Sequence, residues 1–178
     1  ALADTSAGRR LHDESLMAVI LQPYSQSNFE SLYEIDQACY PRGIAYSRAT
    51  LRKFLTLPGS ACLFARAGGE PQPPIAGFII AESAGSEGRI ITIDVLEAFR
   101  RTGIGSALLL AIEERLAVNG ANRVELETAT ANAAGVAFWE RHGYRKLGIL
   151  REYYLGRLDA WEMYKTLAPV VASHVHNT

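Results

Sequence analysis

Apolar positions follow two different periods along this 178-residue chain. Short apolar runs bounded by glycine, proline or asparagine are typical of strands, and apolar residues three or four positions apart are typical of helices. Strands are predicted over residues 18–22, 61–67, 74–83, 88–95, 122–129, 144–150 and 159–167. Helices are predicted over residues 27–40, 48–57, 104–118 and 132–143. The resulting order, β-α-α-β-β-β-α-β-α-β-β, predicts an α/β domain with helices on both faces of one sheet.

Local signals mark the ends of the first two helices. Ser27 lies three residues before Glu30, which is the spacing of a capping box, so the first helix is expected to begin at Ser27. Pro41 ends this helix, and Ser47 is expected to cap the second one.

Composition narrows the class of protein. The chain has 48% hydrophobic and 21% charged residues, as an ordinary soluble globular protein has. Its formal net charge of −1 gives no overall basic field that would attract nucleic acid. No apolar run reaches the ~20 residues that cross a membrane. We expect one domain over residues 18–168, an N-terminal extension over 1–17 that lacks the apolar centre of a secretory signal, and a flexible tail over 169–178.

Cysteines and histidines give no sign of a metal site. Cys39 and Cys62 are far apart and lack the spacing of a zinc site, so they are expected to be buried free thiols in a reducing cytoplasm. His174 and His176 lie two residues apart in the C-terminal tail, where a frayed polar segment is the better interpretation.

A glycine-rich turn, "RRTGIG", joins the strand over 88–95 to the next helix. Glycines let the backbone approach an anion closely, and the first amides of a helix have no partner within it. The helix dipole and the two arginines would add attraction for phosphate oxygens. A P-loop is excluded because no lysine follows Gly105, and a dinucleotide fold would need a third glycine. The diphosphate of coenzyme A and a ligand-free tight turn remain.

Four motifs, in order, resemble those of the GNAT superfamily of N-acetyltransferases. "RRTGIG" is similar to its acetyl-CoA signature, Q/R-x-x-G-x-G/A, and "NAAGVAFWERHGY" is similar to a second signature that runs from asparagine to a Gly-aromatic pair. "ACYPRGIAYS" and "REYYLGRLDAWEM" resemble the substrate side of the branch that acetylates protein N-termini, including the ribosomal-protein alanine acetyltransferases. The resemblance covers residues 18–167. It implies a single-domain GNAT-like fold with a mixed, mostly antiparallel sheet of about six to seven strands.

Acetyl-CoA is the cofactor that the resemblance implies, with direct transfer of acetyl to a primary amine in a ternary complex. The implied cofactor residues come from the strand end, the glycine turn and the next helix: Ile93, Val95, Arg100, Arg101, Thr102, Gly103, Ile104, Gly105, Ser106, Asn132 and Trp139. In this superfamily the strand containing Val95 splays from its neighbour and leaves a main-chain N–H for the thioester oxygen. Asn132 is also expected to cap its helix.

Acyl transfer to an amine needs a base, because the ammonium form cannot attack. Glu127 stands five residues before Asn132, where the resembling branch has a glutamate that acts as base through water. Alternation along the strand places Glu125 and Glu127 on one face, and a solvated surface acid is the alternative interpretation. Asp94 is the reserve base, unless it pairs with an arginine or caps a loop.

The proton donor is harder to assign. The branch has a tyrosine seven residues after the motif asparagine, but here that residue is Trp139, whose indole cannot protonate a thiolate. Tyr144, Tyr153 or Tyr154 could substitute, with Tyr144 and Tyr154 as the catalytic candidates, or the thiolate leaves without an acid. Trp139 is expected to pack against pantetheine or the core, and His142 either faces solvent or moves protons.

Substrate-binding residues also follow from the resemblance. It places Tyr153 in a peptide groove opposite Tyr40, Arg42 and Tyr46, although core packing on a closing hairpin is the alternative for Tyr153. Arg42 beside an open groove would favour an acidic or carboxylate-bearing acceptor.

Several functions therefore stay open. The acceptor could be a protein N-terminus, a lysine or a small amine. A non-catalytic acyl-CoA sensor is the alternative from another class, and a dinucleotide-binding oxidoreductase is a more distant one. We expect a cytoplasmic monomer or homodimer with no metal, nucleic-acid or membrane partner.

Overall fold

The computed structural model describes residues 18–69 and 71–168. Seven strands are present: β1 (Val19–Pro23), β2 (Ser60–Ala67), β3 (Ile75–Ala84), β4 (Glu87–Val95), β5 (Arg123–Ala129), β6 (Arg145–Tyr154) and β7 (Leu158–Thr166). The helices are α1 (Phe29–Cys39), α2 (Arg48–Thr56), α3 (Ile104–Val118) and α4 (Ala133–Arg141), with short 3-10 turns η1 (Gln26–Asn28) and η2 (Glu97–Phe99). Every predicted strand and helix is found. The predicted extension over 1–17 and tail over 169–178, which holds His174 and His176, lie outside the described residues.

All seven strands form one sheet in the order β1-β2-β3-β4-β5-β7-β6. Neighbouring strands pair antiparallel, except β4 and β5, which are parallel. The expected mixed, mostly antiparallel sheet is therefore confirmed.

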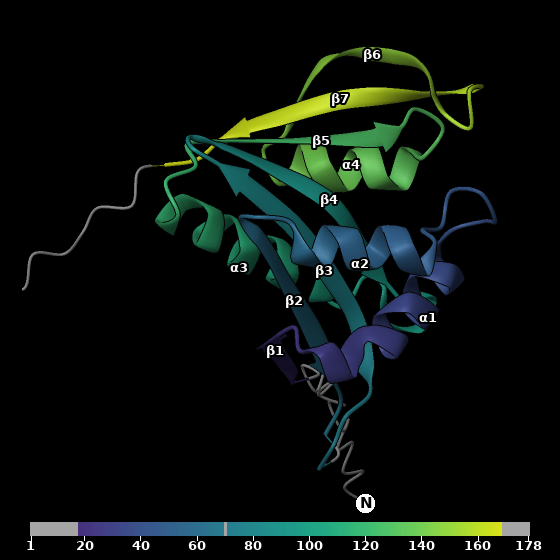
Figure 1. The fold of residues 1–178 in the computed structure, drawn as a ribbon, viewed down its shortest axis with the longest axis vertical. Coiled ribbons are helices and arrows are strands. Elements are labelled where there is room, and N and C mark those ends of the chain that lie inside the picture. Colours follow the sequence, from purple (N-terminus) through teal and green to yellow (C-terminus); the bar gives the residue numbers. More distant parts are fainter. Residues whose placement is uncertain (1–17, 70, 169–178) are drawn as a thin grey trace, which may run out of the picture.

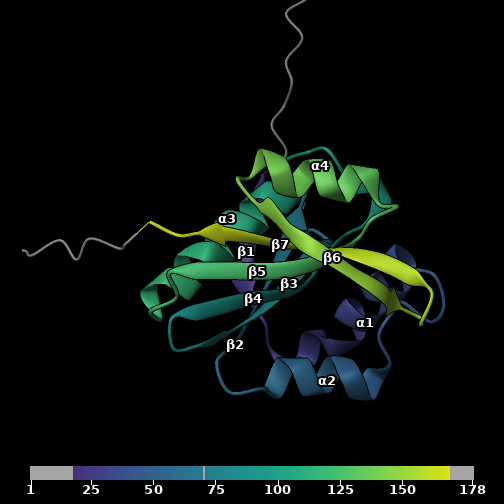
Figure 2. The same ribbon diagram turned by 90° about the horizontal axis from the view of Figure 1, so that it is seen from above.

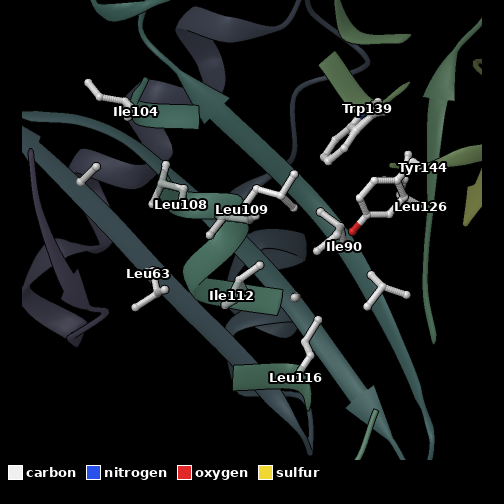
Figure 3. Packing of buried hydrophobic residues seen from close by; sticks show 14 of the residues in the cluster. Leu63, Ile90, Ile104, Leu108, Leu109, Ile112, Leu116, Leu126, Trp139 and Tyr144 are labelled. Atoms are coloured by element: carbon white, nitrogen blue, oxygen red, sulfur yellow. The ribbon is translucent and has the colours of Figure 1, made fainter. Parts of the chain in front are cut away.

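Helices cover both faces of the sheet, as Figure 2 shows: α1 and α2 lie on one side, and α3 and α4 on the other. The α3 face contains the larger core. One side of α3 packs against the sheet there (Figure 3), and its buried side chains are Ile104, Leu108, Leu109, Ile112 and Leu116. Leu32 of α1 and Leu51 of α2 are buried against Phe78 and Ile80 on the other face. The sheet is thus held between two apolar layers.

Parallel pairing between β4 and β5 is short. Only Glu87–Arg89 of β4 pairs with Arg123–Glu125 of β5, and beyond these residues the two strands diverge, which Figure 1 shows as an open V. Since α3 follows β4 and α4 follows β5, both helices begin near the open end of the V.

A β-bulge in β4 sets which side chains face α1 and α2. The register between β3 and β4 shifts at Ile91, which has no partner on β3. Two-residue alternation changes phase at a bulge. As a result Arg89, before the bulge, and Thr92 and Asp94, after it, lie on the same side of the sheet.

The predicted capping box is wrong by two residues. The 3-10 turn η1 precedes α1, and Ser25 caps that turn, with its N–H donating to Asn28 Oδ1 at 3.2 Å. Glu30 pairs instead with Arg48 of α2. The sequence contains two overlapping polar pairs with the same spacing, and the 3-10 turn uses the earlier one.

Close approach of β3 to β4 requires glycine at position 77. Gly77 pairs with Val95, and a Cβ at this position would lie 2.4 Å from the Asp94 carbonyl oxygen. Backbone atoms cannot give way as a flexible side chain can, so a side chain here would push β4 away from β3.

Gly77→Ala should therefore lower the free energy of unfolding by about 1–3 kcal/mol. Urea denaturation followed by circular dichroism measures this loss. Gly69→Ala is the matched control, because a Cβ at position 69 would meet nothing within 4 Å and its φ is not positive. Equal stability of the two variants would contradict the close approach.

Candidate active site

Backbone groups of β4 point into the V. Leu96 N–H donates to Ala76 O at 2.9 Å, so alternate residues at this end of β4 face β3. The carbonyl of Val95 faces the other way and accepts Arg100 Nε at 2.9 Å. Because the N–H and C=O of one strand residue face the same edge, the Val95 N–H also points into the V. The Val95 N–H, which the resemblance implies as the main-chain donor, thus lies where β4 and β5 diverge, as expected.

The glycine turn has the backbone of an anion-binding loop. Gly103 lies immediately before α3 with φ 90°, and Arg101 also has a positive φ of 62°. The first bond of the helix runs from Ala107 N–H to Gly103 O at 2.9 Å, so the amides just before Ala107 have no acceptor within the helix. Thr102 Oγ1 donates to Phe99 O at 2.6 Å and braces the turn. Arg101 is exposed beside these amides.

Helix α4 packs closely on the first turn of α3. A Cβ on Gly105 would lie 3.3 Å from the Phe138 ring. His142 Nδ1 lies 2.8 Å from Phe138 O, and its Nε2 lies 2.9 Å from Ser106 Oγ. A carbonyl only accepts, so Nδ1 carries the hydrogen, and in the neutral ring Nε2 accepts from Ser106. His142 thus links the two helices and does not simply face solvent.

Asn132 caps α4, as predicted. Its Oδ1 accepts from Gly135 N–H at 3.0 Å, and a Cβ on Gly135 would lie only 2.3 Å from the Asn132 amide nitrogen. Glycine at position 135 therefore leaves space for the Asn132 side chain to cap the helix.

Glu127 lies on the face of the sheet opposite α3 and α4. Val124, Leu126 and Thr128 are buried, whereas Glu127 is partly exposed, which confirms the alternation along β5. The Glu127 carboxylate accepts Arg89 Nη2 at 2.9 Å. Glu127 is therefore held in an ion pair that the sequence did not indicate.

Both tyrosines of β6 reach this ion pair. Tyr153 OH lies 3.2 Å from Arg89 Nη2, and Tyr154 OH donates to Glu127 O at 3.2 Å. Burial raises the pKa of both phenols, so neither ionises near neutral pH.

The loop between α1 and α2 lies on the same side of the V. Tyr40 OH is 3.4 Å from both Ile93 O and Thr92 Oγ1, and Tyr46 OH is 3.4 Å from Ile91 O. The buried carboxylate of Asp36 holds this loop by accepting Tyr46 N–H at 2.8 Å. Arg42 is exposed on the same loop.

Asp94 is a buried carboxyl at the open end of β4. Its side chain is 1% exposed, and Oδ1 accepts from Thr92 Oγ1 at 2.6 Å. The other oxygen, Oδ2, has no hydrogen-bond partner, and the arginine pairing considered from the sequence is not found among the described residues. Burial, with a contribution from the charge of Asp36, raises the pKa of Asp94 to about 7.

Tyr144 and Trp139 are not brought into the V. Tyr144 OH donates to Glu113 Oε1 at 2.9 Å, and Lys165 Nζ donates to Glu113 Oε2 at 2.6 Å, inside the α3 core. Trp139 packs edge-on against Tyr144, with ring centroids 5.3 Å apart. Figure 3 shows these two side chains beside each other. These two residues serve the core: Trp139 packs there from α4, and Tyr144, which follows that helix, is held there by Glu113 of α3.

Arg89, Thr92 and Asp36 were missed by the sequence analysis. Arg89 and Thr92 join the site through the bulge in β4, which has no signal in the strand's apolar pattern. Asp36 occupies a polar position on an otherwise apolar helix face, and this buried polar position was the one available sign.

Residues 18–69 and 71–168 contain no group of histidine, cysteine and acidic side chains arranged to hold a metal. None of their helices has the length and apolar character to cross a membrane.

A family model described as "Acetyltransferase (GNAT) family" matches residues 29–144, which contain the V, the glycine turn and α4. The chain belongs to the GNAT acetyltransferase family. The resemblance noted in the motifs is therefore confirmed at the level of the family.

Relatives in this family include enzymes that act on protein N-termini. An N-alpha-acetyltransferase of Sulfurisphaera tokodaii is 36% identical over 78 residues, 43% of this chain and 47% of the relative. The [Ribosomal protein bS18]-alanine N-acetyltransferase of Escherichia coli is 34% identical over 89 residues, 48% of this chain and 60% of the relative. These matches thus span about half the length of the relatives.

The GNAT fold is also found in solved structures. The crystal structure of the ribosomal-protein-S18-alanine N-acetyltransferase from Escherichia coli matches with a TM-score of 0.74 and 22% identity, over 90% of this chain and 100% of that one. At this identity the likeness shows the fold alone.

Asp94→Asn should stabilise the protein more at pH 8 than at pH 4. The folded-state pKa of Asp94 lies above its ordinary value of 3.8, at about 7. In the parent protein the raised pKa means that protonated Asp94 stabilises the fold at low pH, and this contribution is lost as the pH rises to 7. Asparagine stays neutral, so the variant does not lose stability in this way. The change in the mutational effect between the two conditions should reach at most about 4 kcal/mol.

Urea unfolding at a series of pH values measures this difference. Asp159→Asn is the control, because Glu152 N–H and Arg151 lower the pKa of Asp159, so its loss should cost stability at pH 8. A difference between Asp94→Asn and the parent that stays constant with pH would contradict the raised pKa.

Proposed function

We propose that this chain is an acetyl-CoA-dependent N-acetyltransferase that transfers acetyl directly to a protein N-terminal amine in a ternary complex. One observation carries the proposal: β4 and β5 diverge beside the N-terminus of α3, with the glycine turn on one side and a tyrosine-lined face on the other. Such a V admits a thioester from one side and an amine from the other.

The cofactor half is supported by the backbone of the turn. The amides that precede α3 and the exposed guanidinium of Arg101 would bind the diphosphate. The Val95 N–H would hold the thioester oxygen as it gains negative charge. Ser106 and Asn132 lie at the first turns of α3 and α4, where the pantetheine arm would pass.

The acceptor half is supported by the side chains on the α1–α2 face. Glu127 would attract the ammonium and take its proton through a water, with Arg89 holding its carboxylate, Tyr153 contacting Arg89 and Tyr154 bonded to the Glu127 main-chain carbonyl. Tyr40 and Tyr46 form the opposite wall. Relatives named as N-alpha-acetyltransferases favour a protein N-terminus over a small amine.

Turnover of acetyl-CoA against a panel of amines tests this proposal. The panel contains peptides that differ only in their first residue, the same peptides with a blocked N-terminus, a lysine-bearing peptide and a polyamine. Release of CoA with free N-termini and not with blocked ones is expected. Binding of CoA without turnover of any amine would instead indicate an acyl-CoA sensor.

Arg101→Ala should raise the KM for acetyl-CoA about tenfold or more, because a charge-assisted hydrogen bond to phosphate is lost. Steady-state kinetics with S-acetylpantetheine, which lacks the diphosphate, should show little change. Arg48→Ala removes an exposed arginine on α2 and serves as the control. A loss that is equal for both acyl donors would place Arg101 away from the diphosphate.

A further inference from the structure

Acetylation removes two protons from the acceptor nitrogen. The amine arrives as an ammonium ion with three N–H bonds, and the amide product keeps one. One carboxylate, Glu127, faces the acceptor side through its ion pair with Arg89. The reaction therefore needs a second proton acceptor. Tyr144 and Tyr154, the tyrosines that the sequence suggested as acids, do not supply it.

A chain of hydroxyl groups leads from the V to a buried carboxylate. Tyr40 OH lies against Ile93 O, whose carbonyl faces into the V, and Tyr40 remains partly exposed. The same hydroxyl is 3.4 Å from Thr92 Oγ1, which donates to Asp94 Oδ1 at 2.6 Å. The chain ends in a carboxyl group that is 1% exposed and has one oxygen without a partner.

Burying a carboxyl without a cation or a full set of donors is unfavourable, so such a group is an unusual feature of a core. Asp36, the other buried acid of this face, differs because its carboxylate holds the backbone N–H of Tyr46 and so has a structural task. Asp94 holds no backbone group of another element among the described residues.

We infer that Asp94 is the second proton acceptor of the acetyl transfer and that it is reached through the hydroxyls of Tyr40 and Thr92. The inference rests on the proposed acetyltransferase function and adds a proton path to it.

Glu127 takes the first proton of the ammonium through a water, and the freed electron pair forms the C–N bond to the thioester carbon. The C–S bond then breaks, and CoA leaves as a thiolate. As the nitrogen gives its second proton to Tyr40 oxygen, the phenol proton passes to Thr92 and the Thr92 proton passes to Asp94 Oδ1.

Asp94 can return this proton to the CoA thiolate along the same two hydroxyls, those of Thr92 and Tyr40. Its pKa of about 7 lies below the ~8.5 of an ordinary thiol, so transfer to the thiolate is downhill. One proton per turnover reaches solvent, from Glu127. Burial and the nearby Asp94 raise the pKa of Tyr40, so Tyr40 passes protons as a phenol and does not act as the base itself.

Several titratable or charged groups face Asp94 and set its charge. They are Asp36, Cys39 and Tyr40 from α1 and its C-terminal end, Tyr46 from the following loop, Cys62 from β2 and Arg100 from the glycine turn. Burial raises the pKa of Cys39 to about 11 and that of Cys62 to about 12, so both thiols stay neutral while Asp94 titrates.

The test is the pH dependence of kcat/KM with one acceptor peptide, so that the acceptor's own titration is constant. In the parent protein, kcat/KM should rise with pH through a limb near 7, as Asp94 becomes able to accept. Asp94→Asn should lower kcat by about a hundredfold or more and abolish this limb. Glu127→Gln should slow turnover but keep the limb.

Thr92→Val provides a second variant should Asp94→Asn fold poorly. Thr92 links Tyr40 to Asp94, so its removal should lower kcat and remove the limb, as Asp94→Asn does. A residue with a purely structural role would not move the limb.

Glu113→Gln and Tyr144→Phe are the matched controls. They make the same kinds of change in a buried acid–tyrosine pair inside the α3 core, so the limb should stay where it is in the parent. Thermal melting and CoA binding, measured for every variant, correct for the folded fraction.

Two results would overturn the inference. Turnover by Asp94→Asn within threefold of the parent, with the limb intact, would remove Asp94 from the proton path and leave the acetyltransferase function standing. Absence of turnover by the parent protein with every amine would overturn the proposed function, and the proton path with it.

Discussion

The divergence of β4 from β5 is the constraint on which the site depends. In a continuous sheet the Val95 N–H would be paired with the next strand, and no backbone donor would be left for a ligand. Here the parallel pairing ends at Arg89, so the edge of β4 is bare beyond that residue. A bare edge in the middle of a sheet is costly unless something fills it, and an extended thioester with amide groups along its length is suited to do so.

Much of this arrangement could be predicted from the sequence because it depends on local patterns. Strand and helix periods gave all eleven elements, and the Asn132 cap and the turn before α3 followed from residues next to them in the chain. The capping box at Ser27 failed for the same local reason, since Ser25 and Asn28 offer an equivalent pair two residues earlier.

The chemistry of the acceptor side was less predictable because it depends on a single extra residue. In β4 the residues Ile90, Thr92 and Asp94 are all buried, which reads as an undisturbed two-residue alternation. The bulge at Ile91 means that Ile90 faces α3 while Thr92 and Asp94 face α1. Simple alternation would put Arg89 on the face opposite Asp94, and so the ion pair with Glu127 could not be foreseen.

The same bulge explains why two carboxyl groups on neighbouring strands have such different surroundings. Glu127 lies two residues beyond the last pair of β5 with β4, still within reach of Arg89, and it is partly exposed. Asp94 lies further along, where the strands have separated and α1 covers the sheet, so it accepts a hydrogen bond from Thr92 and forms no ion pair within residues 18–69 and 71–168. Different surroundings can push the pKa values of two carboxyl groups apart, and burial raises that of Asp94. Strand divergence, which opens the V beside α3, thus also gives the two acids their different surroundings.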